Sequence, residues 1–580
     1  MSGNTQPYFR SRAAVSLRIV ACLLVGVALL VFIGYFVVYT NYAAALFRFP
    51  FDYDQGEGFE LMDTVLFSRG RWPYQDINRY PFYSSNYPPL FHLLTVPLVW
   101  LFGPQYWTGR LVSYLATLVT AGAIGYAVQR EGKRWWLSLI AGLSFLASNY
   151  VYHVGSLFRQ HLTMVTFETL AVVAAAVVIQ KEERRGSQSW RGWLVVMLLL
   201  LAAGYTKQLA YATVAAVFVF LFLRQPKRAI RWAIPFGLVT GLIFLGINVA
   251  TNGQWLTNTI TANLNPFVPG QAIGLYQQWF KLHTLLIVVA AVFSVYQLYF
   301  ERLSAYTIWF VLATVNSVTA GKWGAGESYF TTAIAASCVL TGIGLARLLN
   351  RFEQESSSQD RHGWAGLTDW CKRISAWRAA AYVNSSHPRP SAQSAPSAFY
   401  LAQAIVALLF LWQASLVFHL PTHTPLLRSV ASLLGQPAEV MVAPQTSCSA
   451  PRPPQPVPYV DTARVTLLGR PPTAQDTAAG IAIANWVKEG RTAAFSEDAG
   501  FNFYAGRDVV TNPTQLLNLY QNGQVDLTEM MAMLDEQRFD TVILRAQFYP
   551  PPVLGVIGQR YRTTELIEMN GFVYCIMAPK

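Results

Sequence analysis

Long runs of apolar residues, separated by short polar connections, dominate residues 1–420 of the chain. Most of these runs hold roughly 17–23 residues, enough for a helix to cross about 30 Å of hydrocarbon. The pattern predicts a mainly α protein, built on a polytopic bundle of about 11 transmembrane helices. The expected spans are 19–41, 105–127, 135–152, 162–179, 192–206, 208–223, 232–250, 279–299, 304–320, 329–347 and 400–419.

One apolar stretch differs from the others. The sequence PPLFHLLTVPLVWLF, at 88–102, is short and contains prolines. Counting it as a span would reverse the side of every later loop and break the charge alternation described below. We therefore expect it to form an interfacial helix on the outer membrane surface.

The distribution of charge gives the orientation. Only 13% of the 580 residues are charged and 53% are hydrophobic, a composition that indicates a membrane protein. The net charge of +13 is concentrated in every second connection between apolar runs, where it is an orientation signal and not a surface for nucleic acid. The positive-inside rule places these connections and the N-terminus in the cytoplasm, in an inner (plasma) membrane.

A soluble region follows the last span. Helical patterns at 475–489, 514–521 and 526–537 alternate with strand patterns at 492–496 and 539–545, before a final strand pair that ends in GFVYCIMA. This alternation predicts a small α/β domain, which an odd number of spans places outside the cytoplasm. The expected organisation is a membrane domain at 1–420 with its first outer loop at 42–104, a polar cytoplasmic linker at 350–398, and an extracytoplasmic α/β domain at 421–580.

The first outer loop is crowded with carboxylates. Its sequence FDYDQGEGFELMD holds Asp52, Asp54, Glu57, Glu60 and Asp63. We expect Glu60 and Asp63 to be solvated, whereas Asp54 and Glu57 alternate with glycines, which allow a ligand to approach the backbone. A partly desolvated carboxylate suits the removal of a proton from a sugar acceptor, because burial raises its basicity. A structural role stays open, since a helix N-terminus also favours acidic residues.

Four cations stand at the outer ends of spans: Arg110, Arg159, Lys207 and Lys322. Charges at this depth are costly and usually face a cavity or a partner. Lys207 lies in GYTKQ, a short break between two apolar runs where no orientation signal requires a cation. An anionic phosphate would bind such residues well, through charge-assisted hydrogen bonds. The alternative is that the side chains reach to the interface without a ligand.

Other outer segments are rich in residues that bind sugars or metals. GKWGAGESYF is a glycine-rich loop, and TNGQWLTNTITANLNPF combines amides with a tryptophan. His92, His153 and His161 lie near these loops without ligand spacing, so the sequence gives no histidine metal motif. The loop carboxylates could hold Mg²⁺ or Mn²⁺, so a divalent cation is possible and no cofactor is certain. Asp52, Tyr87, Gln208, Glu327 and Tyr329 are the candidate substrate-binding residues.

In their order along the chain, these elements resemble the GT-C superfamily of membrane glycosyltransferases, which includes protein O-mannosyltransferases and lipid A aminoarabinose transferases. The resemblance runs from about Phe51 to about Tyr329. It rests on YDQGEG, a W-P-Y turn followed by YPPLFHLL, the FRQH loop, the TKQ break, the Asn-rich loop and GKWGAGESYF. The chain has no WWDYG-type motif of the oligosaccharyltransferases, which argues against that branch.

The resemblance implies an inverting transfer of a sugar, at the outer face, from a polyprenyl-phosphate donor to a lipid, glycan or protein acceptor. A first-loop acid would serve as base. The family often has Asp directly before Glu-Gly, but this chain has Gly56 there, so we take Asp54 as the base and Glu57 as second choice. Many relatives also carry an acid where this chain has His161. The donor phosphate would bind to Lys207, Arg159, Arg110 and Lys322.

Two other hypotheses stay open. A transporter or flippase for lipid-linked glycans would place charges near the midplane and show internal repeats, and the chain shows neither. A non-catalytic assembly protein would depend on the surface of 475–580 and would tolerate changes in the acidic loop.

Overall fold

Helices follow the apolar runs along the whole membrane domain. The computed structural model describes residues 6–358, 395–417, 425–434, 471–545 and 548–580. Each expected span coincides with at least one helix. These helices are α1 (Gln6–Arg48), α4 (Tyr106–Gly132), α5 (Trp135–Ala147), α6 (Asn149–Val154), α7 (His161–Arg185), α8 (Trp190–Thr206), α9 (Tyr211–Arg224), α10 (Pro226–Ala250), α13 (Thr284–Phe300), α14 (Ala305–Asn316), α15 (Thr331–Ser358) and α17 (Ala395–Leu416).

The chain is a multi-pass membrane protein, although the number of spans stays a prediction. Among the described residues, six helices are long and apolar enough to cross a membrane. The count becomes seven if α12 (Pro269–Leu282) and α13, which meet at 93°, form one broken span. The shorter apolar helices α5, α8 and α9 account for much of the difference from the predicted number.

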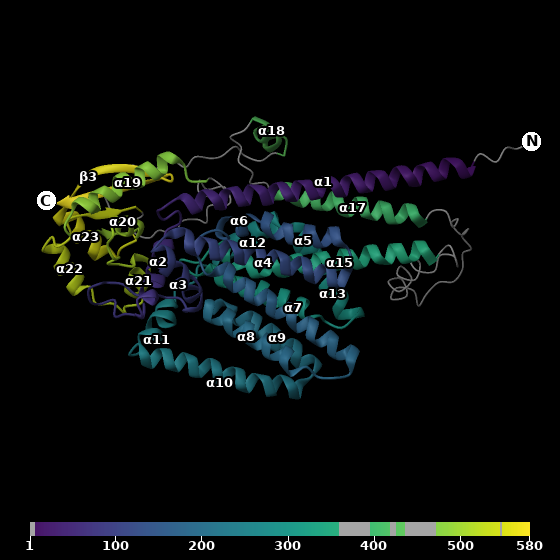
Figure 1. The fold of residues 1–580 in the computed structure, drawn as a ribbon, viewed down its shortest axis with the longest axis horizontal. Coiled ribbons are helices and arrows are strands. Elements are labelled where there is room, and N and C mark those ends of the chain that lie inside the picture. Colours follow the sequence, from purple (N-terminus) through teal and green to yellow (C-terminus); the bar gives the residue numbers. More distant parts are fainter. Residues whose placement is uncertain (1–5, 359–394, 418–424, 435–470, 546–547) are drawn as a thin grey trace, which may run out of the picture.

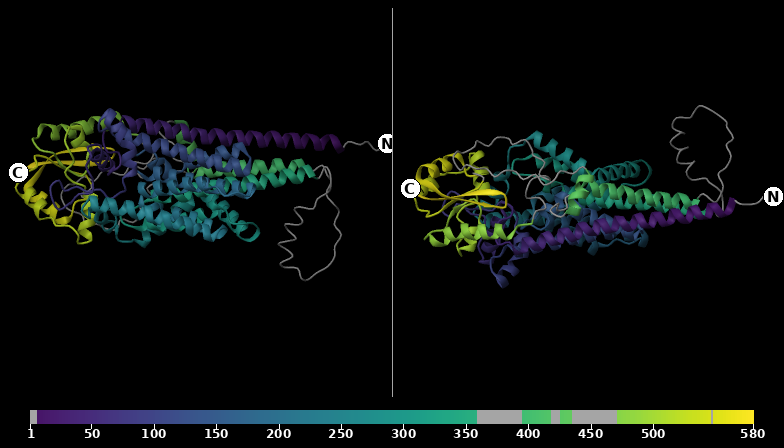
Figure 2. Two further views of the ribbon diagram at one scale, coloured as in Figure 1. Left: turned by 60° about the horizontal axis from the view of Figure 1, so that its bottom comes forward. Right: turned by 90° about the horizontal axis from the view of Figure 1, so that it is seen from above.

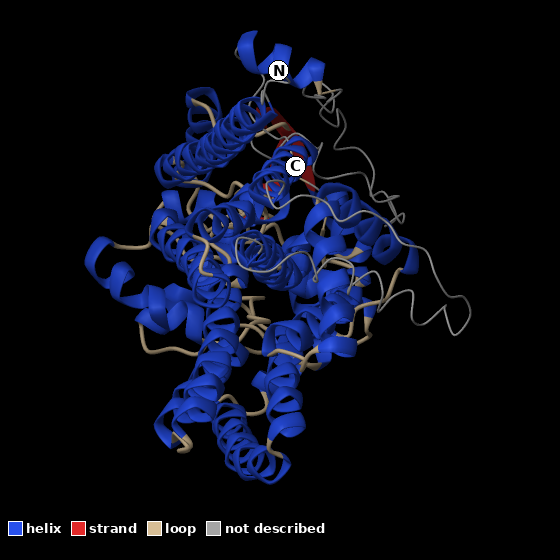
Figure 3. Cartoon of the chain, turned by 90° about the vertical axis from the view of Figure 1, so that its right-hand side faces the viewer, coloured by secondary structure: helices blue, strands red, loops and turns tan. Residues whose placement is uncertain are grey.

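The bundle is layered around two central helices. The most apolar stretch of each long helix is buried to a different extent. In Glu327–Gln354, which includes most of α15, 83% of this stretch is buried, and in α7 the share is 78%. In α10 only 6% of it is buried. α10 therefore lies at the edge of the bundle, as Figure 1 shows, with an apolar surface that suits contact with lipid. The bundle helices run roughly along the long axis and are seen nearly end-on in Figure 3.

The non-membrane elements gather at one end of the bundle. α1 extends to the opposite end from the C-terminal domain in all views (Figures 1 and 2). The stretch expected at the membrane surface is a helix, α3 (Leu90–Phe102), which packs against α2 (Glu57–Ser68) of the acidic loop. Further short elements are α11 (Gln254–Thr259), η1 (Gln208–Ala210), η2 (Thr261–Asn263), η3 (Ser317–Gly321) and η4 (Glu327–Phe330).

The C-terminal region forms the α/β domain that its sequence predicts. Its sheet has the order β1-β2-β4-β3; β1 pairs parallel with β2, and the other pairs are antiparallel. The sequence patterns missed three of its short helices, α18, α20 and α23. The elements are α18 (Pro425–Leu433), α19 (Ala474–Glu489), β1 (Phe495–Ser496), α20 (Gly500–Tyr504), α21 (Pro513–Gln521), α22 (Thr528–Asp535), β2 (Val542–Leu544), α23 (Pro551–Arg560), β3 (Tyr561–Met569) and β4 (Phe572–Pro579).

The expected linker at 350–398 and the start of the expected C-terminal domain lie largely outside the described residues. Within the described part of 350–398, α15 continues to Ser358 and α17 begins at Ala395.

The C-terminal domain is attached to the first outer loop by buried polar contacts. The Asp52 carboxylate accepts hydrogen bonds from the Gly58 N–H (2.7 Å), the Tyr106 hydroxyl (2.7 Å) and the Gly500 N–H (2.8 Å). Burial and the charge of Asp498 raise the pKa of Asp52. The predicted substrate-binding residue Asp52 is thus 1% exposed and connects α2, α4 and α20.

The close contact at Gly58 provides a test of this attachment. A Cβ atom at Gly58 would lie 2.5 Å from the Ala499 Cβ and 2.6 Å from the Tyr106 hydroxyl. We expect Gly58→Ala to lower the stability of the purified protein by about 1–3 kcal/mol, because both neighbours must move. Thermal unfolding in detergent measures this, with Gly204→Ala as control, since a Cβ there would meet nothing within 4 Å. Equal unfolding temperatures for the two variants would contradict the prediction.

Candidate active site in the outer loops

A buried ion pair anchors the acidic loop to the bundle. Glu57 and Arg110 are both fully buried, with Nε–Oε1 and Nη2–Oε2 distances of 2.9 and 2.7 Å. Arg110 also donates to the carbonyls of Leu46, Phe49 and Phe51. The same Glu57 carboxylate accepts hydrogen bonds from the backbone N–H groups of Tyr53, Asp54 and Phe158.

This pair leaves neither residue in contact with solvent or substrate. A carboxylate that accepts from two guanidinium nitrogens and three backbone N–H groups has no lone pair left for an acceptor hydroxyl. Arg110 likewise directs its donors to Glu57 and to three carbonyls. The structure places Glu57 and Arg110 in the buried framework of the loop, which favours a structural role for both over base chemistry or phosphate binding.

Gly56 is required because the Arg159 side chain packs against it, whereas the sequence led us to expect a ligand there. Gly56 has φ 103°, in the left-handed region that disfavours residues with a Cβ. A Cβ there would also lie 2.9 Å from two guanidinium nitrogens of Arg159. The glycine makes room for Arg159, which also donates to the Gln55 carbonyl.

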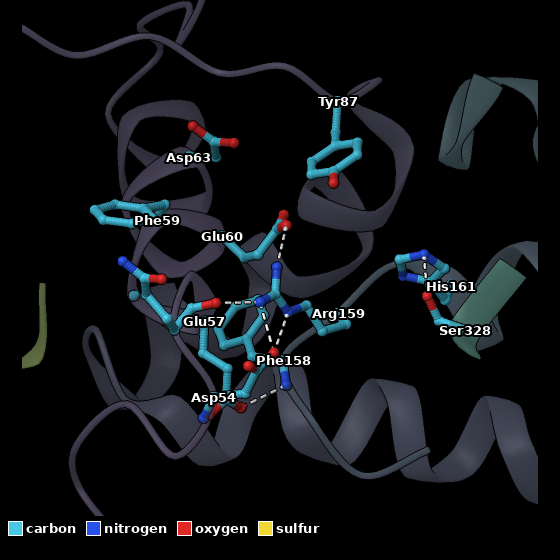
Figure 4. Close-up of polar contacts among 12 residues, drawn as sticks. Asp54, Glu57, Phe59, Glu60, Asp63, Tyr87, Phe158, Arg159, His161 and Ser328 are labelled. Atoms are coloured by element: carbon cyan, nitrogen blue, oxygen red, sulfur yellow. Dashed lines mark hydrogen bonds and ion pairs between the residues drawn. The ribbon is translucent and has the colours of Figure 1, made fainter. Parts of the chain in front are cut away.

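Arg159 lies between two carboxylates of the loop (Figure 4). Its Nη2 is 2.6 Å from Asp54 Oδ2, and its Nη1 is 3.8 Å from Glu60 Oε1. Both Asp54 contacts use Oδ2, so Oδ1 accepts no hydrogen bond from the described residues. The Asp54 side chain is 33% exposed, whereas Asp52, Glu57, Glu60 and Asp63 are each at most 3% exposed.

Glu60 and Asp63 are not solvated, contrary to the sequence interpretation. α2 packs against α3 and α4, and this burial raises the pKa of Glu60 to about 8 and that of Asp63 to about 7. Asp63 accepts hydrogen bonds from the hydroxyls of Tyr83 (2.7 Å) and Ser85 (2.5 Å). The periodicity of α2 carried a signal for this burial, because both acids fall among Leu61, Val65 and Leu66 on a short apolar helix.

Lys207 is buried at the break between α8 and η1. Its Nζ lies 2.5 Å from His161 Nε2 and over the rings of Tyr87 and Tyr329, at 4.6 and 5.2 Å from their centroids. Burial lowers the pKa of Lys207 to about 7, partly offset by the charge of Glu60. An anion beside Lys207 would favour its charged form.

A cavity of about 260 Å³ opens beside Lys207. It brings together five residues singled out in the sequence, and it adds the carbonyl- and amide-rich segment before α12. Two residues from α21 complete the wall, so the C-terminal domain contributes directly to the cavity. The lining comprises Asn86, Tyr87, Lys207, Gln208, Leu209, Tyr211, Thr259, Ile260, Asn263, Leu264, Asn265, Thr319, Lys322, Trp323, Gly324, Tyr329, Thr514 and Asn518.

The other predicted residues take defined places around this cavity. Lys322 is held by a backbone bridge to Phe267, and Gln208 Nε2 donates to the Asn86 and Thr259 carbonyls at 3.1 Å. Glu327 does not line the cavity; its Oε1 pairs with His153 Nδ1 at 2.7 Å. Sequence reasoning missed Asn86, Thr514 and Asn518, which carry no motif of their own.

Comparisons with known proteins bear on the fold of the whole chain. The family of dolichyl-phosphate-mannose-protein mannosyltransferases matches residues 86–255. ArnT from Cupriavidus metallidurans, crystallised with undecaprenyl phosphate, is 16% identical with a TM-score of 0.50, over 96% of this chain and 97% of that one. The oligosaccharyltransferase of Archaeoglobus fulgidus is 10% identical with a TM-score of 0.52, over 97% and 74%. No curated protein matches the chain by sequence.

This chain has the fold of the GT-C membrane glycosyltransferases. The predicted resemblance is thereby confirmed, as is the predicted helical bundle with a C-terminal α/β domain. The family match and the shared GT-C fold support a role in glycosyl transfer. Within that fold, the cavity beside Lys207 and the partly exposed Asp54–Arg159 pair are the candidate sites of chemistry.

The contrast between Glu57 and Asp54 leads to a stability test. Glu57→Gln leaves Arg110 buried without its partner charge, and we expect it to cost about 3–5 kcal/mol. Asp54→Asn alters a partly exposed pair, and we expect a cost of about 1 kcal/mol or less. Thermal unfolding and size-exclusion profiles of both variants in detergent measure the difference. A larger loss of stability for Asp54→Asn would contradict the assignment of Glu57 to the framework.

Proposed function

We propose that the protein transfers a sugar from a polyprenyl-phosphate donor to an acceptor hydroxyl or amine, with inversion, at the outer face of the membrane. The observation that carries the proposal is the exposure of one first-loop carboxylate, Asp54, close to buried cations and a polar cavity. The N-terminus is then cytoplasmic and the C-terminal domain extracytoplasmic, as the charge of the connections requires.

Asp54 is the proposed base. Arg159 holds Oδ2 and thereby orients the carboxylate, while Oδ1 is left to accept the acceptor proton. As that proton moves to Oδ1, the acceptor oxygen or nitrogen forms a bond to the anomeric carbon from the face opposite the phosphate. The bond from the anomeric carbon to the phosphate oxygen breaks, and the lipid phosphate departs with the electron pair.

Lys207 and Arg159 are the proposed partners of the departing phosphate. Both are buried or nearly so, and each influences the same carboxylate, Glu60. Positive groups fixed in a site of low dielectric stabilise the charge that develops on a leaving group more strongly than water does. Lys322 lines the same cavity and is proposed to contact the donor phosphate or sugar. Tyr87, Gln208 and Tyr329 are proposed to bind the sugar, because all three line the cavity.

The C-terminal domain is proposed to select the acceptor. Thr514 and Asn518 reach the cavity from α21, and Gln515 Nε2 donates to the Asn258 carbonyl at 3.1 Å. The domain is therefore fixed against the loop that follows α10. A lipid, a glycan and a protein are all acceptor classes that this open polar wall would accommodate.

The role of Asp54 is tested by transfer of radiolabelled sugar from a panel of polyprenyl-phosphate donors, in membranes that contain wild type or Asp54→Asn. We expect the variant to lose about 10²–10⁴-fold in rate, because the asparagine amide cannot accept the proton. Asp508→Asn, an exposed acid of the C-terminal domain, is the control. Unchanged transfer by Asp54→Asn would refute the base, and no transfer by folded wild type with any donor would favour the transporter hypothesis.

The phosphate contact is tested by Lys207→Met, which keeps the length of the side chain and removes its charge. Loss of a charged hydrogen bond costs about 1.5–3 kcal/mol, so we expect kcat/KM for the donor to fall about 10- to 100-fold. Lys281→Met, at an exposed position of α12, should leave the value unchanged. Equal donor kinetics in the two variants would exclude Lys207 as a phosphate ligand.

A further inference from the structure

A second polar cluster lies between α2 and α3, behind the Asp54–Arg159 pair. Glu60 and Asp63 are three residues apart on α2 and so face the same side of the helix. Their carboxylates point to His92 of α3, and the three side chains are 3, 4 and 0% exposed. The proposed transfer reaction gives none of the three a proton-transfer role, so the burial of two acids beside a histidine needs a separate explanation.

The hydrogen bonds of Thr64 fix the tautomer of His92. The Thr64 hydroxyl donates its proton to the Glu60 carbonyl at 2.9 Å. It can therefore only accept at its contact with His92 Nδ1, 3.2 Å away, which places the ring proton on Nδ1. His92 Nε2 then carries a lone pair, and it has no hydrogen-bond partner among the described residues.

That lone pair faces the two carboxylates directly. His92 Nε2 lies 3.4 Å from Glu60 Oε2 and 3.6 Å from Asp63 Oδ2. Three lone-pair-bearing atoms that face one another in a dry site repel unless a cation or a proton lies between them. The spacing favours a cation, because both distances exceed the roughly 2.7–3.2 Å of a well-formed hydrogen bond.

The two distances from His92 Nε2 match those between ligands around one metal ion. Bonds of about 2.0–2.2 Å at tetrahedral angles place two ligand atoms about 3.3–3.6 Å apart. No two of the ligand atoms of Glu60, Asp63 and His92 are more than 4.8 Å apart. The surrounding groups also match a metal site: Thr64 holds the far nitrogen of His92, and Tyr83 and Ser85 donate to Asp63.

We propose that Glu60, Asp63 and His92 bind one divalent transition-metal ion, with Zn²⁺ as the preferred ion. One imidazole and two carboxylates form a donor set that suits Zn²⁺ and related first-row dications. The bound ion would keep Glu60 ionised, and Glu60 Oε1 would then hold Arg159 in place from the side opposite Asp54. The site is independent of the proposed transfer reaction, since it would bind metal whether or not the chain transfers a sugar.

The test measures metal content directly. Full-length protein, purified in detergent and stripped with EDTA, is dialysed against Zn²⁺ and its metal is counted by plasma mass spectrometry. We expect about one Zn²⁺ per chain in wild type and in the control His153→Gln, whose histidine pairs with Glu327. His92→Gln and Asp63→Asn should each bind Zn²⁺ about tenfold or more weakly, since each loses a ligand.

A second measurement distinguishes loss of the metal site from loss of folding in the variants. Zn²⁺ should raise the unfolding temperature of the EDTA-treated wild type but not that of a folded, monodisperse His92→Gln or Asp63→Asn variant, because a ligand stabilises only the state that binds it. Equal Zn²⁺ content in wild type and both variants, or wild type without bound Zn²⁺, would overturn the proposal. The space between His92 and the two carboxylates would then hold a proton of Glu60 and no metal ion.

Discussion

The buried pair of Glu57 and Arg110 is the contact on which the geometry of the acidic loop depends. It joins the first turn of α2 to α4, and the remaining donors of Arg110 fasten the end of α1 and the chain that follows it. A third element joins through the Phe158 N–H. A charge pair buried this completely is stable only when every donor and acceptor is used, which fixes one geometry for the loop.

That geometry gives each carboxylate of the loop a different exposure and different partners. Glu57 pairs with Arg110, and Asp52 binds the Gly500 N–H of the C-terminal domain. Among the five acids of the loop, Asp54 is the one whose side chain is partly exposed. Glu60 lies between Arg159 and the histidine of α3, where burial raises its pKa. One short acidic segment thus supplies a framework, a candidate base and a candidate metal site, and the differences arise from packing and not from residue type.

The cavity beside Lys207 is assembled from segments far apart in the chain. The break between α8 and η1, the loop before α12, the segment before α15 and helix α21 each contribute part of its wall. Such a site requires both domains, because α21 of the C-terminal domain forms part of its wall, and contacts with the first loop and with Asn258 hold that domain in place. This dependence explains why a soluble domain is attached to a membrane bundle by buried polar contacts.

The sequence by itself determined the helices and the α/β domain, because these depend on local periodicity and on hydropathy. It also singled out Lys207 and Tyr329 as candidate ligand-binding residues, in two different segments of the chain. Only the tertiary structure decided which charges meet, since Arg110 finds Glu57 across 53 positions and His92 finds Glu60 from another helix. Pairing in a dry interior depends on distances of a few ångströms, and no spacing along the chain encodes them.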